Sequence, residues 1–196
     1  MFLPAAKKLL STTNYTLVLL LTFTGFRKGE ALGLQWDDIC FKTNTITVNR
    51  TRDKYGTRTP KSKKSYRTIK IDDILITQLK SYYLWCKKIK LSLGLHLQEN
   101  DLVFITNTGS PCNDSTLNKA FESLFDGLEI KRITPHGLRH THATILIEKR
   151  IPVIEIAQRL GNTPQMIYNV YGHSFDKIEN ESVQAFSESV NSKAIQ

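Results

Sequence analysis

The segment from residue 136 to 142, HGLRHTH, carries two imidazoles and a guanidinium at helical spacing. His136, Arg139 and His140 stand at i, i+3 and i+4, which places all three on one face of a helix. A planar guanidinium matches two phosphate oxygens, and an imidazole can take up or release a proton near neutral pH. The pattern therefore predicts a surface that binds a phosphate group.

The same pair of histidines has a second interpretation as a zinc site. Two His residues at i and i+4 resemble the H-E-x-x-H motif of metalloproteases. No Glu lies between His136 and His140, however, and Arg139 would repel a cation on the same face. We therefore expect an anion rather than a metal ion at this surface.

A second arginine follows a turn near the beginning of the chain, in the segment 24–30, TGFRKGE. Arg27 is expected in the first turn of a helix, where unpaired backbone amides and the positive end of the helix dipole also favour an anion. Taken alone, the segment could be no more than a basic helix start. Glu30 could orient Arg27 or form a plain surface ion pair with it.

The composition favours a nucleic-acid partner and a reducing compartment. The 196 residues contain 27 Lys and Arg against 18 Asp and Glu, a formal charge of +9, which suits a polyanion, although solubility alone would also explain it. The three cysteines, Cys40, Cys86 and Cys112, form neither a disulfide framework nor paired C-x-x-C ligands. The cysteine content therefore predicts a reducing cytoplasm.

The longest apolar run, residues 17–23, is interrupted by Thr22 and is much shorter than the roughly 20 residues that a membrane-spanning helix needs. We expect it to form a buried helix. Elsewhere, alternation predicts strands at 45–52 and 66–71, joined by a long basic arm, and the segment after Asp72 predicts a long helix. Further helices are expected at 4–10, 27–34, 114–125, 136–149, 152–160, 163–171 and 175–190.

The predicted fold class is therefore α+β, mostly α-helical, with one small antiparallel β-sheet near the N-terminal third of the chain. In the helix that begins at His136, Leu138 and Ile145 are expected to face the core.

Taken together, several segments resemble the tyrosine recombinases of phages and mobile elements. The order and spacing of these segments match the family over about residues 15–175. They are TGFRKGEAL at 24–32 with LQWDDI at 34–39, HGLRH at 136–140, Leu160-Gly161, and VYGH at 170–173. The resemblance implies a tyrosine recombinase catalytic-core fold and an enzyme that integrates or excises a mobile element by cutting and rejoining DNA. The resemblance also implies that this reaction needs no ATP, no metal ion and no other cofactor.

The resemblance assigns roles to four of these residues. Arg27 and Arg139 correspond to the two arginines that hold the scissile phosphate, and Tyr171 corresponds to the nucleophile that forms a 3′-phosphotyrosyl link. His136 corresponds to the histidine that assists proton transfer or supports the phosphate. Tyr168, one helical turn earlier, is the rival nucleophile, but Tyr171 has the family's interval from Leu160-Gly161 and is followed by Gly-His.

The family's general-acid lysine lies on the arm before the second strand. Lys61 fits this position best, Lys63 is the rival, and Lys64 is expected at the turn. Lys63, Lys64 and His140 are expected to contact DNA. Asn162 departs from the pattern, because the family usually has His or Trp there. It can donate a hydrogen bond to a phosphate oxygen but cannot be protonated, so a slower reaction is expected.

The resemblance also predicts domains and partners. Residues 1–175 are expected to form the catalytic domain, and residues 176–196 a helical tail that docks in cis or in trans. The family's N-terminal core-binding and arm-binding domains are expected to be absent from this chain. The expected partners are double-stranded DNA at attachment sites, three further copies in a homotetramer on synapsed DNA, and accessory DNA-bending or excision proteins. Without DNA a monomer is expected, and no membrane partner.

Other functions remain open at this stage. The segment 153–162 resembles a helix-turn-helix, so a non-catalytic DNA-binding regulator is the main alternative. It leaves the spacing of Arg27, His136 and Arg139 unexplained. A type IB topoisomerase or a telomere resolvase would use similar chemistry, and Asn162 is the one hint of an inactive relative.

Overall fold

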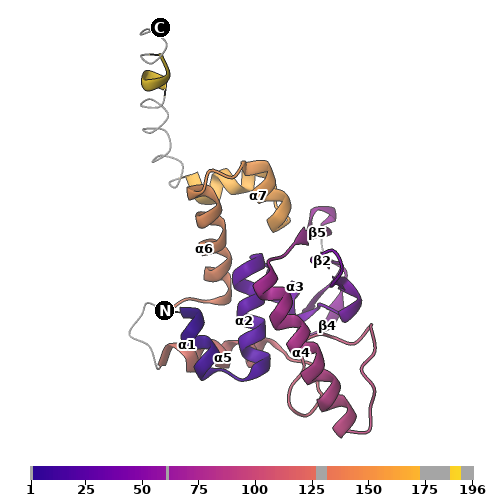
Figure 1. Cartoon of the computed structure of the whole chain (residues 1–196). Helices are drawn as coiled ribbons and strands as arrows, with labels where there is room; N and C mark the ends of the chain where they lie inside the picture. Colours follow the sequence, from indigo (N-terminus) through magenta and orange to yellow (C-terminus); the bar gives the residue numbers. More distant parts are fainter. Residues whose placement is uncertain (1, 61, 127–131, 173–185, 191–196) are drawn as a thin grey trace.

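Helix α2 (Thr12–Thr24) is the central element of the computed structural model. It begins at the cap Ser11, whose hydroxyl accepts a hydrogen bond from the Asn14 amide, and it ends at Gly25. The structure describes residues 2–60, 62–126, 132–172 and 186–190. The helices packed around α2 are α1 (Phe2–Leu9), α3 (Lys28–Leu32), α4 (Asp73–Ser92), α5 (Asp114–Asp126) and α6 (Pro135–Glu148) (Figure 1).

The apolar run predicted to be a buried helix lies in α2, and that prediction is confirmed. Leu17, Leu19 and Leu21 are at most 1% exposed, because neighbouring helices cover α2 on several sides. A helix that is apolar nearly all round can avoid water only in such a position. No helix in the described part of the chain is long and apolar enough to cross a membrane.

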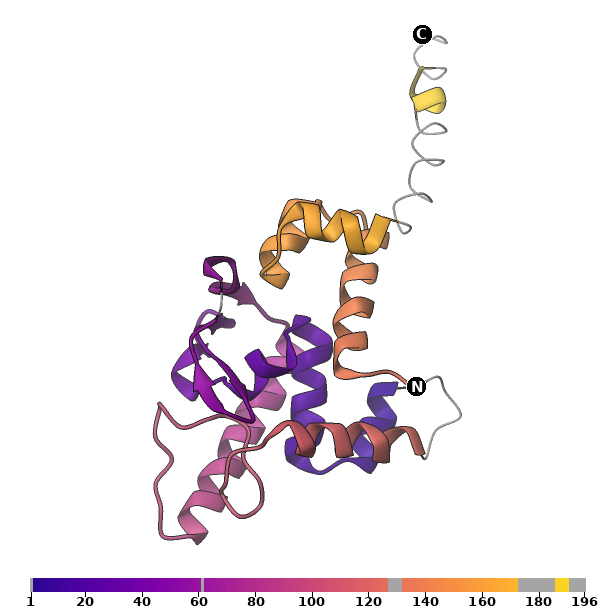
Figure 2. The same ribbon diagram turned by 180° about the vertical axis from the view of Figure 1, so that it is seen from behind.

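A three-stranded antiparallel sheet covers the side of the body next to α3 and α4 (Figure 2). Its order is β1 (Ile39–Cys40), β2 (Thr45–Val48) and β5 (Arg67–Lys70), and Ile46 lies opposite Ile69. Ile46 and Val48 point inward and are at most 1% exposed, as the alternation predicted. The predicted small antiparallel sheet is therefore confirmed.

The prediction of one strand over residues 45–52 is wrong. The strand stops at Val48 because the next two side chains turn to Asp38: Asn49 Nδ2 and Arg50 NH1 donate to its buried carboxylate at 2.8 and 2.6 Å. The chain then forms a separate hairpin within the arm, β3 (Thr51–Asp53) with β4 (Gly56–Arg58). A short 3₁₀ turn, η2 (Lys63–Ser65), leads back into β5.

Helix α6 extends away from the body, and α7 (Val153–Leu160) packs against it (Figure 1). A further helix covers residues 164–172. These elements enclose a small hydrophobic cluster of their own, which we call the small cluster. The expectation for Leu138 is confirmed, but Ile145 is 49% exposed because this part of α6 has left the body, so its inward positions are Ala143 and Ile147.

The small cluster is distinct from the larger one that fills the body around α2, the body cluster. The small cluster consists of Ala143, Ile147, Ile156, Ala157, Leu160, Ile167 and Tyr171. The helix expected at 175–190 lies mostly outside the described residues, as does the tail from 176 onward, of which only 186–190 is described, as helix.

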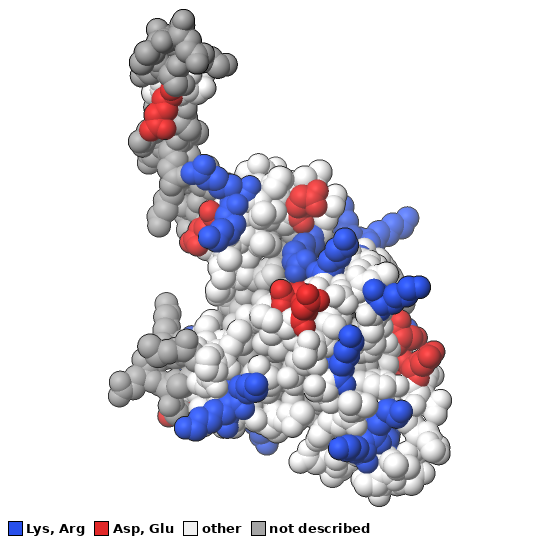
Figure 3. All heavy atoms as spheres, in the orientation of Figure 1, with Lys and Arg blue, Asp and Glu red and all other residues white. Residues whose placement is uncertain are grey.

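Positive charge does not form one continuous patch on the face seen in Figure 3. Groups of Lys and Arg side chains lie over several elements there, with Asp and Glu side chains between them. The net charge of +9 therefore indicates a polyanion only in general terms, and a specific site has to be found from individual contacts.

Candidate active site

Two glycine turns lie opposite each other where the body meets α6 and α7. Gly25 has φ +65° and Gly161 has φ +63°, a backbone region that glycine adopts readily. A Cβ at Gly25 would lie 2.7 Å from Leu160 Cδ2, and one at Gly161 would lie 2.7 Å from Arg67 NH1. Both turns therefore need glycine for conformation and for space.

Arg139 joins these two turns. Its NH1 donates to the Gly25 carbonyl at 2.8 Å and its NH2 donates to the Leu160 carbonyl at 2.7 Å. The residue is only 4% exposed, and burial, followed by the repulsion of Arg27, lowers its pKa from 12.5 to about 10. It remains a cation at neutral pH, held by main-chain dipoles next to a second guanidinium.

Arg27 caps the N-terminus of α3 and reaches the second glycine turn. Its NH1 donates to Glu30 Oε1 at 2.9 Å, and its NH2 donates to Asn162 Oδ1 at 2.7 Å. Glu30 Oε2 also accepts the Arg27 amide at 2.9 Å. Glu30 is 4% exposed, so the pair that the sequence left open is a buried contact that orients Arg27, not a surface ion pair.

The sequence pattern did not reveal Arg67, which completes this network. Its NH1 and NH2 bind both oxygens of Glu30, at 3.1 and 2.8 Å, and its Nε donates to the Arg159 carbonyl at 2.7 Å. In the sequence, Arg67 stands at the end of the basic arm, just before an apolar strand, and nothing in its residue type separates it from the other basic residues of that arm. Only its burial, with 6% of the side chain exposed, distinguishes it from the exposed lysines of the arm.

A second pair that sequence reasoning missed holds α6 and α7 to the end of α2. The ring Nδ1 of His142 lies 3.0 Å from the Thr22 carbonyl, and its Nε2 accepts a hydrogen bond from Arg159 Nε at 3.1 Å. Arg159 also donates to the carbonyls of Phe23 and Lys70 at 2.9 and 3.1 Å. Burial is the largest cause that lowers the pKa of His142, to about 4.

The two imidazole rings predicted to share a face of α6 lie side by side, and one of them contacts the helix of residues 164–172. The centroids of His136 and His140 are 4.5 Å apart and edge-on, and His140 lies 5.4 Å from the ring of Tyr171. Tyr171 is 5% exposed, whereas its rival Tyr168 is 50% exposed. Burial raises the pKa of Tyr171, and the charge of Arg139 works against that rise.

His136 lies at the start of α6, one turn before Arg139. The hydroxyl of the cap Thr134 accepts the Gly137 amide at 3.0 Å, and Pro135 occupies the first helical position. Burial is the largest cause that lowers the pKa of His136, followed by the charges of His140, Arg139 and Arg27. These causes favour the neutral form of the His136 imidazole.

The chain matches the model of the phage integrase family over residues 2–177. It belongs to that family. The tyrosine recombinase XerC-like protein of Caldanaerobacter subterraneus subsp. tengcongensis is 32% identical over 189 residues, and the integrase of Staphylococcus phage L54a is 33% identical over 170 residues. These matches cover 88% and 82% of this chain but 48% of each relative. The chain thus spans about half the length of these curated relatives.

Solved structures confirm the fold of this phage integrase family member. The Tn1549 transposon integrase, in complex with transposon right-end DNA, matches with a TM-score of 0.74 at 20% identity, covering 92% of this chain and 62% of that one. XerA recombinase matches with a TM-score of 0.66 at 24% identity, covering 92% and 59%. The predicted tyrosine recombinase catalytic-core fold is therefore correct.

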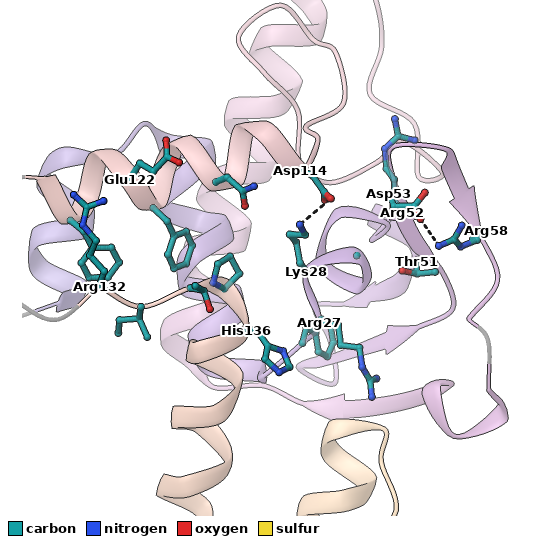
Figure 4. A pocket seen from close by; sticks show the side chains of 18 residues that line it. Arg27, Lys28, Thr51, Arg52, Asp53, Arg58, Asp114, Glu122, Arg132 and His136 are labelled. Atoms are coloured by element: carbon teal, nitrogen blue, oxygen red, sulfur yellow. Dashed lines mark hydrogen bonds and ion pairs between the residues drawn. The ribbon is translucent and has the colours of Figure 1, made fainter. Parts of the chain in front are cut away.

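A cavity of about 780 Å³ opens beside the arginine network. Arg27 and His136 line one end of it, and α3, α5 and the β3–β4 hairpin form its walls (Figure 4). Lys28 and Asp114 face each other across the cavity at 2.9 Å. The cavity therefore opens the side of the site on which Arg27 and His136 lie.

The general-acid lysine stays a prediction, because Lys61 lies outside the described residues. Lys63 and Lys64 lie in η2 and are exposed. The Lys64 carbonyl oxygen would be 3.1 Å from a Cβ at Gly161, so the base of the arm touches the second glycine turn. The proposed contacts of Lys63, Lys64 and His140 with DNA also stay predictions. No cluster of three or more His, Cys, Asp or Glu suited to a metal ion occurs among the described residues.

Proposed function

We propose that this chain is the catalytic part of a site-specific DNA recombinase that integrates or excises a mobile element. Tyr171 is the nucleophile, and Arg27 and Arg139 hold the scissile phosphate. The observation that carries the proposal is Arg139, buried between the two glycine turns with Arg27, His136 and Tyr171 around it.

The reaction exchanges one phosphoester bond for another. The Tyr171 oxygen attacks phosphorus, the bond from phosphorus to the 5′-oxygen breaks, and a 3′-phosphotyrosyl link and a free 5′-hydroxyl result. The tyrosine proton leaves to a base, for which neutral His136 is suited, and the 5′-oxygen takes a proton from the arm lysine. The 5′-hydroxyl of a partner strand then reverses the step, so no ATP is consumed.

Charge supports the assignment of the two arginines. The transition state carries negative charge on the nonbridging oxygens, and fixed cations are most effective where water is excluded. Arg139 is already fixed by two carbonyls, and Arg27 by Glu30 and Asn162. Asn162 uses its carbonyl oxygen for Arg27, so we assign its amide group to the phosphate.

The remaining expectations belong to the whole protein and are proposals as well. We assign double-stranded DNA at attachment sites as substrate, a tetramer on two synapsed sites as the active assembly, and the bacterial cytoplasm as its location. Accessory DNA-bending proteins would set the direction of exchange. The segment 153–162, which resembled a helix-turn-helix, directs the carbonyls of Leu160 and Gly161 at Arg139 and Arg27, and this favours a role in the site.

The test is covalent capture on a nicked suicide substrate that carries the attachment core, with EDTA present. The wild type is expected to form a DNA adduct that peptide mapping locates at Tyr171. Tyr171→Phe keeps the ring in the small cluster but removes the nucleophilic oxygen, so no adduct is expected. Tyr168→Phe, one helical turn away on an exposed position, is the matched control and should react like the wild type. An adduct with Tyr171→Phe would refute the assignment.

A further inference from the structure

Arg67 is part of no motif that the family resemblance supplies, yet its side chain reaches three segments of the site. It binds both oxygens of Glu30, and its NH1 and Nε donate to the carbonyls of Ser65 and Arg159 at 2.9 and 2.7 Å. We propose that Arg67 is a positioning residue, which fixes the phosphate-binding guanidinium of Arg27 through the shared carboxylate of Glu30. This inference rests on the proposed function of Arg27.

The first step of the argument is geometry. Glu30 accepts four hydrogen bonds, two from Arg67 and two from Arg27, one of them from the Arg27 amide. Its carboxylate is therefore held in one orientation by Arg67 from the sheet side. Because Arg67 occupies both oxygens of Glu30 in this way, the Arg27 side chain can approach the Glu30 carboxylate from one direction only.

The second step concerns the other end of Arg27. Arg67 Nε holds the carbonyl of Arg159, which is three residues before Asn162. Asn162 in turn accepts Arg27 NH2 at 2.7 Å. Arg67 thus supports both partners of the Arg27 guanidinium, one by a bidentate ion pair and one through the end of α7.

The third step is charge, because a buried carboxylate keeps its proton unless cations surround it. The groups that face Glu30 are Arg27 from α3, Arg67 from β5 and, at longer range, Arg139 from α6. Burial raises the pKa of Glu30 more than any other single cause, but the hydrogen bonds and charge of Arg67 lead the opposing causes and the net pKa is lowered. Without Arg67 the carboxyl would protonate at a higher pH and would bind Arg27 less strongly.

The chemistry of the position requires arginine. A lysine would keep the charge, but it cannot bind two carboxylate oxygens and a carbonyl at fixed angles. The Arg67 guanidinium also lies over the Phe26 ring, 5.0 Å from its centroid, and is close enough to Gly161 to exclude a Cβ there. Arg67→Lys therefore keeps the positive charge but loses the bidentate geometry, whereas Arg67→Gln loses both.

The experiment measures the rate of adduct formation on the suicide substrate as a function of pH. Displacement of a reacting group by about 1 Å can cost roughly 100-fold in rate, so we expect Arg67→Lys to be about tenfold slower and Arg67→Gln about 100-fold slower. The acid limb of the pH profile should also move to higher pH in Arg67→Gln, because Glu30 then protonates earlier.

Arg50→Gln is the matched control. Arg50 also binds a buried carboxylate, that of Asp38, at 2.6 Å, but that pair is not connected to Arg27 by any hydrogen bond described here. Arg50→Gln should lose a comparable amount of stability and keep both the rate, within about threefold, and the acid limb of the wild type. If Arg50→Gln matched Arg67→Gln in rate and pH profile, or if Arg67→Gln were as fast as the wild type, the proposal would be overturned.

A second readout needs no catalysis. The Arg27 amide is protected by its hydrogen bond to Glu30 Oε2, so its hydrogen exchange in the DNA-free protein reports the same carboxylate. Faster exchange of this amide in Arg67→Gln, but not in Arg50→Gln, is expected. If the wild type formed no adduct, the proposed function would fail while the exchange rates still decided the role of Arg67. Unchanged exchange of the Arg27 amide in Arg67→Gln would overturn the proposed role of Arg67.

Discussion

The body cluster and the small cluster are held together by different physics. The body cluster joins helices α1 to α6 and the sheet through buried apolar side chains, of which Leu17, Leu20 and Leu75 are fully buried. The small cluster, on the elements that carry Tyr171, has only seven members. Between the two clusters lies a layer of arginines, the buried side chains of Arg67 and Arg139 and the half-buried Arg159, whose hydrogen bonds end mainly on main-chain carbonyls.

This difference shows how Tyr171, the proposed nucleophile, is located relative to the arginines proposed to bind the phosphate. Apolar burial is nearly without direction, whereas a guanidinium that binds carbonyls fixes both distance and angle. The segments that carry Arg27 and Asn162 meet at this layer of arginines, whereas Tyr171 belongs to the small cluster and feels the charge of Arg139. The site is therefore assembled by directional contacts, and the two clusters supply rigid supports on each side.

The largest effect is expected from Arg139→Met, which breaks the layer of arginines and the phosphate site together. It leaves the carbonyls of Gly25 and Leu160 without their donor, at a cost of about 3 kcal/mol in the free energy of unfolding. Adduct formation should fall at least about 100-fold. Arg159→Met should lose similar stability, measured by urea unfolding, but keep adduct formation within about tenfold. Equal losses of activity would mean that the layer of arginines acts only as structural support.

The two clusters should also respond differently to cavities. Leu20→Ala in the body cluster is expected to lower the free energy of unfolding by about 3 kcal/mol, with faster hydrogen exchange throughout the chain. Ile156→Ala in the small cluster creates a cavity of the same kind, but faster exchange is expected only over residues 153–172. NMR measures the exchange of individual amides. If the exchange of α2 amides rose equally in both variants, the two clusters would unfold as one unit.

An intermediate effect is expected from pH, through His142. Its pKa is lowered from 6.5 to about 4, so between these values the unfolded chain binds a proton that the folded one does not. The contribution of neutral His142 is complete above about pH 6.5 and is lost as the pH falls toward 4, by about 2 kcal/mol. A protonated Nε2 would face Arg159 Nε–H. Urea unfolding of His142→Gln at pH 7 and pH 4.5 should show a smaller pH dependence than the wild type. His96→Gln, at an exposed loop position, should show the wild-type dependence.

The smallest effect is expected from the ion pair that crosses the cavity. Lys28 and Asp114 are 35% and 36% exposed, so Asp114→Asn should cost less than about 1 kcal/mol, and the cost should vanish in high salt. If Asp114→Asn lowered the free energy of unfolding by more than about 2 kcal/mol, and did so in 1 M salt as well, this pair would behave like the ion pairs of the buried arginines. Urea unfolding at low and high salt measures the difference.

The sequence by itself predicted the parts that depend on local spacing. The face shared by His136 and His140 and the buried character of α2 follow from helical periodicity and from residue type. The choice between Tyr171 and Tyr168 came from the family's interval and remains a prediction, as does Lys61. The strand expected at 45–52 failed because Asn49 and Arg50 bind Asp38, a contact that alternation does not encode.

Only the tertiary structure revealed the layer of arginines. Arg67 and Arg139 donate to main-chain carbonyls 92 and 114 residues away in the sequence, and every residue has such a carbonyl. A carbonyl acceptor leaves no mark on residue type, so no pattern of letters could indicate it. The sequence thus determined which side chains can do the chemistry. The packing of α2, β5, α6 and α7 decided which arginines are buried, and so which of them hold the others in place.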